Sequence, residues 1–151
     1  MRKTKSQELI QLFHYWCGRL KINKPVELIK DNRIDCPMEI ITDDNTKIIA
    51  KYNSRIIGQY PHCILLGYIF HEISHILNNL SYNTYKEKVY SEYRAEKSAH
   101  SMLQKYYPKE YLEILKYYKK KQTLKKLYKK QRLYYDAFIK IKEYKDSDEI
   151  F

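Results

Sequence analysis

The sequence predicts an α+β domain, and three of its features support that prediction. Apolar residues recur at helical spacing near the start of the chain and again in most of it after residue 62. Short runs rich in β-branched residues lie between these two regions. The chain has 151 residues, of which 44% are hydrophobic, and this is enough to bury one core. The expected order is a helix, a small sheet and then further helices.

The sheet is expected in the first third of the chain, after one helix. Residues 7–20 carry an apolar stripe at helical spacing. Residues 38–42 (MEIIT) and 46–52 (TKIIAKY) are separated by the turn-forming residues 43–45, which is typical of a β-hairpin. The run VELI at residues 26–29 is the candidate third strand.

Two helices are expected next. Residues 62–80 are apolar almost all round, which indicates a buried helix, and residues 81–83 form a short loop. Thr84 is followed three residues later by Glu87, as in a capping box. We therefore expect a second helix to begin there and to run to about Tyr107.

The C-terminal part is predicted to be a helical extension. Pro108 suits the first position of a further helix, and residues 122–145 continue with apolar residues at mixed helical spacings. We therefore divide the chain into a main domain, residues 1–108, and a basic, Tyr- and Lys-rich extension, residues 109–151, packed on or beside it.

Positive charge is concentrated towards the C-terminus. The net charge is +11; residues 104–151 hold 14 basic and 7 acidic side chains, against 15 and 11 in residues 1–103. Eight of the fourteen residues 119–132 are basic, and Tyr128 lies among them. Such a run can bind nucleic acid by contacting phosphates and stacking on bases. The simpler explanation, which we favour, is the solvated face of a helix.

The cysteines and the apolar runs favour a soluble, cytoplasmic protein without a membrane segment. Cys17, Cys36 and Cys63 are odd in number and have no CxxC spacing, so we expect reduced thiols. The N-terminal stretch lacks the uninterrupted apolar core of a signal peptide. No apolar run approaches the roughly 18 residues that a bilayer span needs.

The segment GYIFHEISHIL places a single acidic residue in an otherwise uncharged helix. On a helix, residues four apart lie on one face, so His71 and His75 can direct two ring nitrogens at one ion. Glu72 lies one position further round, where it can reach a water molecule without binding the ion. This is the HExxH pattern of zinc-dependent hydrolases, with two histidine ligands and a glutamate general base. A histidine pair packed in the core is the alternative, but it leaves the costly burial of Glu72 unexplained.

A third protein ligand is expected downstream, because catalytic zinc generally takes three. Within residues 91–103, Glu92 and Glu96 lie one turn apart, and the small residues Ala95 and Ala99 allow a second helix to approach closely. One carboxylate can bind the ion while the other orients a ligand histidine through its second ring nitrogen.

The two motifs together, HEISH and E-x-x-A-E-x-x-A, resemble those of gluzincins and more narrowly of the ImmA/IrrE-type metallopeptidases. The resemblance covers residues 5–108 and implies a small zincin-like domain with zinc as its cofactor. By the family pattern Glu92 is the third ligand and Glu96 holds a ligand histidine. The family implies endopeptidase action on a protein substrate such as a DNA-binding repressor. Ser98 and the late Pro108 depart from the family pattern.

Two further expectations concern the substrate. A donor is needed for the oxyanion, and we favour His100, eight residues after Glu92 on the same broad helix face. The alternatives are four tyrosines, Tyr82, Tyr85, Tyr90 and Tyr93. We also expect strand 46–52 to be a sheet edge that pairs with an extended peptide.

A catalytically inactive zincin-like binding module is the competing hypothesis, with contacts to nucleic acid through the basic C-terminal helices. Such a protein would lack stoichiometric zinc. Metal analysis of the purified protein therefore separates it from the enzyme.

Overall fold

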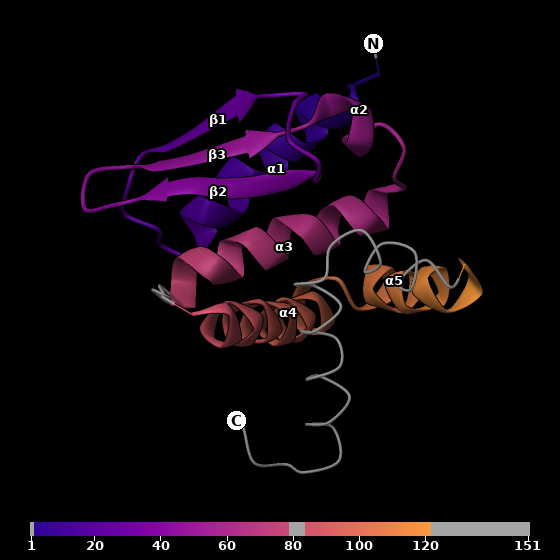
Figure 1. Cartoon of the computed structure of the whole chain (residues 1–151). Coiled ribbons are helices and arrows are strands. Elements are labelled where there is room, and N and C mark those ends of the chain that lie inside the picture. Colours follow the sequence, from indigo (N-terminus) through magenta and orange to yellow (C-terminus); the bar gives the residue numbers. More distant parts are fainter. Residues whose placement is uncertain (1, 79–83, 122–151) are drawn as a thin grey trace.

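The computed structural model describes residues 2–78 and 84–121, and it confirms the predicted α+β order (Figure 1). The elements are α1 (Lys5–Arg19), β1 (Val26–Lys30), β2 (Met38–Asp43), β3 (Ile48–Tyr52), α2 (Ser54–Ile57), α3 (His62–Asn78), α4 (Tyr85–Tyr106) and α5 (Pro108–Lys121). The predictions for residues 81–83 and 122–145, and most of the basic run 119–132, lie outside the described residues.

The sheet contains all three predicted strands, but their order corrects one expectation. The order is β1-β3-β2, with β1 parallel and β2 antiparallel to β3. The strand expected at an edge, 46–52, is therefore the central strand. The hairpin of β2 and β3 could be predicted because the two strands are adjacent in the sequence. The pairing of β1 with the other side of β3 could not, because it joins segments about 20 residues apart. The true edges are β1 and β2, and β2 carries an irregularity between Ile40 and Thr42.

Two helices begin at capping boxes. In α4 the Glu87 backbone N–H donates to the Thr84 hydroxyl at 3.2 Å, as predicted, and the Glu87 carboxylate accepts from the Thr84 N–H. In α1 the same arrangement joins Thr4 and Gln7, so the helix begins at Lys5, two residues before the predicted start. The T-x-x-Q spacing was present in the sequence and marks this start.

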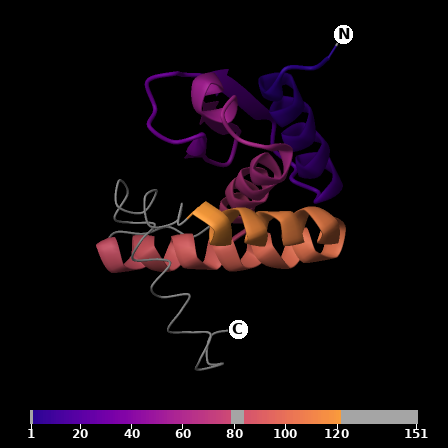
Figure 2. The ribbon, with the colours of Figure 1, turned by 90° about the vertical axis from the view of Figure 1, so that its right-hand side faces the viewer.

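Helix α3 lies at the centre of the molecule (Figures 1 and 2). It packs against α1 and β2 on one side and against α4 and α5 on the other. Eleven of its seventeen residues are buried, which explains why its sequence is apolar almost all round. Ala95 and Ala99 of α4 are each 1% exposed, so the small residues lie at a closely packed helix interface, as expected.

Helix α5 belongs to the same packed body as the elements before it. Its Ile114 is 3% exposed and is part of the hydrophobic core. A Cβ built on Gly67 of α3 would lie 3.7 Å from Ile114 Cδ1, so the side chain of Ile114 packs directly over that glycine. The first part of the predicted extension is thus packed on the main domain. No helix within the described ranges is both long and apolar enough to span a membrane.

The three cysteines are free and buried. Burial raises the pKa of Cys17 and of Cys36 from 9.0 to about 12. Because the thiolate is the reactive form, these thiols behave as small apolar groups of the core.

Candidate metal centre

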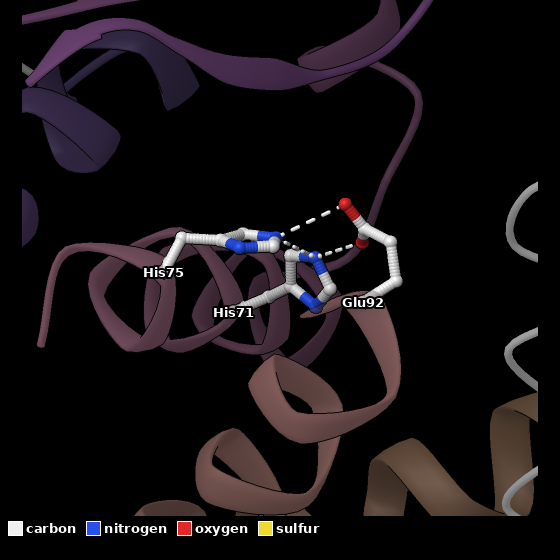
Figure 3. Close-up of side chains that lie close together, drawn as sticks. All are labelled: His71, His75 and Glu92. Atoms are coloured by element: carbon white, nitrogen blue, oxygen red, sulfur yellow. Dashed lines mark hydrogen bonds and ion pairs between the residues drawn. The ribbon is translucent and has the colours of Figure 1, made fainter. Parts of the chain in front are cut away.

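Three side chains from two adjacent helices converge in the structure (Figure 3). His71 and His75 come from α3 and Glu92 from α4, and one possible ligand atom from each lies within 4.8 Å of the other two. The two Nε2 atoms are 3.1 Å apart. The Glu92 carboxylate spans them, with Oε2 2.8 Å from His71 Nε2 and Oε1 3.1 Å from His75 Nε2. The convergence expected from the sequence is therefore present.

Local helix geometry and helix packing produce this arrangement together. The i,i+4 spacing puts both imidazoles on one face of α3, with ring centroids 4.8 Å apart and planes at 78°. The buried alanines of α4 let its backbone approach that face, which brings Glu92 within reach. Buried Ser91, the residue before Glu92, has its hydroxyl 3.5 Å from the other ring nitrogen of His75.

The two carboxylates of α4 occupy different places. Glu92 meets both Nε2 atoms, whereas Glu96 meets the opposite nitrogen of His71, with Oε1 2.5 Å from Nδ1. His71 is consequently held between two carboxylates, one at each ring nitrogen. This geometry matches the expected division between a metal ligand and a residue that orients one, with Glu92 at the ligand position.

The charges of the side chains in this cluster favour the binding of a cation. Burial raises the pKa of Glu92, but the charge of His71 and the hydrogen bonds from both histidines outweigh it and bring the pKa down to about 2. The pKa of Glu96 is likewise lowered against the effect of burial, chiefly by His71 and His100. Burial lowers the pKa of His71, yet the two carboxylates hold it well above 6.5. Two ionised carboxylates thus flank the buried ring of His71 in a partly buried site, and either a proton on His71 or a metal cation balances them.

Glu72 is not one of the three grouped ligand residues, and it lies beside them, next to the sheet. It is 4% exposed, and burial raises the pKa of its carboxyl from 4.5 to about 7, although the positive charges of His71 and His75 oppose the shift. A backbone hydrogen bond from Ile40 of β2 also lowers this pKa. The carboxyl therefore lies between α3 and the edge strand β2, and it exchanges protons near neutral pH, as a general base should.

The structure places His100 behind Glu96 and not among the three grouped ligand residues, and its role at the oxyanion stays a prediction. Its Nε2 lies 3.2 Å from Glu96 Oε2 and its Nδ1 lies 3.2 Å from the hydroxyl of Tyr111. Both ring nitrogens are therefore engaged behind Glu96. Eight residues along a helix amount to a rotation of about 80° beyond two full turns, so Glu92 and His100 face different directions.

Of the tyrosines considered as oxyanion donors, the structure describes the side chains of Tyr90 and Tyr93 but not those of Tyr82 and Tyr85. Tyr93 is buried, and its ring contacts that of Tyr90 at 6.2 Å on α4. Tyr82 and the side chain of Tyr85 lie outside the described part of the chain. The sequence analysis did not identify Tyr111, whose hydroxyl contacts His100. This residue comes from α5, and no spacing along the chain connects it with the HExxH helix.

Comparison with protein-family models, with curated proteins and with solved structures gives no match for this chain.

Proposed function

We propose that this protein is a zinc-dependent endopeptidase in which His71, His75 and Glu92 hold the metal and Glu72 is the general base. The observation that carries the proposal is the convergence of two Nε2 atoms and one carboxylate beside a buried glutamate whose pKa is about 7. The resemblance of HEISH and its downstream E-x-x-A-E-x-x-A motif to the ImmA/IrrE-type metallopeptidases supports the same activity.

The donor set fits zinc. Two imidazoles and one carboxylate are a common protein ligand set of catalytic zinc, which keeps a further position for water or substrate. Ligand bonds of about 2.0–2.1 Å in a tetrahedral site imply donor atoms roughly 3.3 Å apart. The three donor groups already lie 2.8 to 3.1 Å from one another, so a small outward movement accommodates the ion.

The chain's own residues account for the other requirements of peptide hydrolysis. When bound, zinc supplies a Lewis acid that polarises the scissile carbonyl and acidifies water. Glu92 contributes one negative charge to the site, and Glu96 fixes the ring of His71 through Nδ1. Glu72 accepts a proton from the attacking water at its carboxylate and passes it to the leaving amine.

The substrate strand is assigned to β2 in place of the central strand. Of the two sheet edges, β2 is the one that packs against α3, and its Ile40 backbone contacts Glu72. An extended peptide that adds to this edge would lie beside the base. Such recognition is through backbone hydrogen bonds, and it suits a protein substrate. We propose a DNA-binding regulator as that substrate, on the family resemblance alone.

Metal analysis of the purified full-length protein, combined with a cleavage assay, tests this function. We expect one zinc per chain in the wild type and in Glu72→Gln, and none in His75→Ala. Incubation with regulators encoded by neighbouring genes, followed by mass spectrometry, should reveal cleavage by the wild type alone. A wild-type protein without stoichiometric zinc would instead favour the inactive binding module.

A further inference from the structure

We propose that His100 and Tyr111 are positioning residues of the metal centre, which tie helix α5 to the ligand His71 through Glu96. The inference rests on the proposed zinc function of the site. It adds two residues outside both sequence motifs, one of them on a helix beyond the region that resembles the peptidase family.

A continuous chain of hydrogen bonds supports this assignment. The hydroxyl of Tyr111 lies 3.2 Å from His100 Nδ1, and His100 Nε2 lies 3.2 Å from Glu96 Oε2. The second oxygen of the same carboxylate lies 2.5 Å from His71 Nδ1. His71 Nε2 then points at the ligand cluster, 2.8 Å from Glu92. Four side chains from α5, α4 and α3 thus form one path that ends at a metal ligand.

One consistent set of hydrogen-bond directions fits this path. A carboxylate oxygen accepts hydrogen bonds, so Glu96 takes a hydrogen from His71 Nδ1 and another from His100 Nε2. In the Nε2–H tautomer of His100, Nδ1 accepts a hydrogen from the Tyr111 hydroxyl. Tyr111 therefore selects the tautomer of His100 that holds Glu96. Glu96 in turn selects the tautomer of His71 whose Nε2 lone pair faces the metal position.

The support at the α5 end is rigid. The rings of Tyr111 and His100 meet edge to face, with centroids 5.4 Å apart and planes at 77°, so the contact fixes the orientation of the imidazole as well as its hydrogen bond. Ile114, one turn after Tyr111 on α5, is buried against Gly67 of α3. The helix that carries Tyr111 is therefore anchored on the same helix that carries His71.

The test measures zinc affinity of the full-length protein by competition with a chromophoric chelator. Partners of metal-binding histidines typically change metal affinity by 10–100-fold when removed, so we expect His100→Leu to weaken zinc binding by about tenfold. His100→Gln keeps a donor for Glu96 and should recover most of that loss. Tyr111→Phe deletes a single hydroxyl and should weaken binding by about threefold, the size of one modest hydrogen bond.

Tyr107→Phe is the matched control. It also removes a partly buried tyrosine hydroxyl with a hydrogen bond, which here comes from Trp16 Nε1 at 3.2 Å, but it does not touch the path to His71. Its zinc affinity should equal that of the wild type. Nitrogen NMR of the histidine side chains adds a readout without catalysis, since His100 should be a single Nε2–H tautomer in the wild type and a mixture in Tyr111→Phe.

The outcomes separate this inference from the proposed function. A wild type that binds no zinc refutes the function and with it the inference. Wild-type zinc affinity in both His100→Leu and Tyr111→Phe overturns the positioning role and leaves the zinc site standing. Equal losses in Tyr111→Phe and Tyr107→Phe overturn it too, because they would reflect general destabilisation. If His100→Leu fails to fold, the comparison of the two single-hydroxyl variants decides the question.

Discussion

Two clusters of charged side chains in this protein differ in how their negative charge is balanced. At the end of β1, Asp31 accepts hydrogen bonds from the backbone and the guanidinium of Arg33 and pairs with Lys51 at 3.0 Å. One acid there faces two bases, and the cluster is complete. At the α3–α4 interface, Glu92 and Glu96 enclose His71, and either a proton on that imidazole or a metal cation balances their charge. A carboxylate balanced by permanent Arg and Lys cations is structural, whereas carboxylates balanced by a histidine proton form a candidate metal site, because a metal can replace the proton.

The largest expected effect is on catalysis at the second cluster. Glu72→Gln should retain zinc and lower peptide hydrolysis by about 10²–10⁴-fold, because it removes the proton acceptor but none of the ligands. Zinc content and the cleavage rate of the same preparation measure this. A variant that still cleaves at the wild-type rate would remove Glu72 from the mechanism.

The next effect separates the two carboxylates of α4. Glu92→Ala should abolish stoichiometric zinc, whereas Glu96→Ala should keep the ion with an affinity lowered about 10–100-fold. Chelator competition measures both, and Asp31→Asn serves as the control from the complete cluster, with unchanged affinity. The reverse pattern, an empty site in Glu96→Ala only, would exchange the roles of the two residues.

Metal removal should lower the melting temperature only of proteins in which the cluster of His71, His75 and Glu92 is intact. At free zinc about 100 times the dissociation constant, binding to the folded state alone adds about 2.7 kcal/mol to the free energy of unfolding. Chelation should therefore lower the melting temperature of the wild type and of Asp31→Asn alike. The melting temperature of His71→Ala should not respond. Calorimetry with and without chelator checks this, and an equal response in His71→Ala would place the zinc elsewhere.

The smallest effect is expected from pH at the first cluster. Hydrogen bonds from Arg33 hold the pKa of Asp31 well below its ordinary value. Because the folded pKa is depressed, the pairing stabilises the protein above the ordinary aspartate pKa of about 4 and is lost as the pH falls towards the folded value. The urea midpoints of wild type and Asp31→Asn should differ slightly at pH 7 and converge in acid. The Arg33 side chain is 88% exposed, so salt should shrink the difference as well.

Local spacing explains which parts of the site were predictable. The turn of a helix alone places His71 and His75 on one face, and the apolar residues around them required that this helix be buried. The capping box at Thr84 likewise follows from residues three apart. In each case the interacting groups are close in sequence, so their geometry depends little on the rest of the fold.

Contacts between distant segments had to come from the tertiary structure. Residue spacing left the choice between Glu92 and Glu96 open, although the family resemblance favoured Glu92, and the packing of α4 against α3 brings the Glu92 carboxylate to both Nε2 atoms. The sheet order placed strand β3 at the centre, and helix α5 brought Tyr111 to His100. The sequence by itself determined the α+β order and one buried helix with two histidines on one face and a glutamate beside them. The packing of helices and strands decided which carboxylate joins the two histidines, which strands form the sheet edges and which side chains lie behind Glu96, because these depend on contacts that no local period encodes.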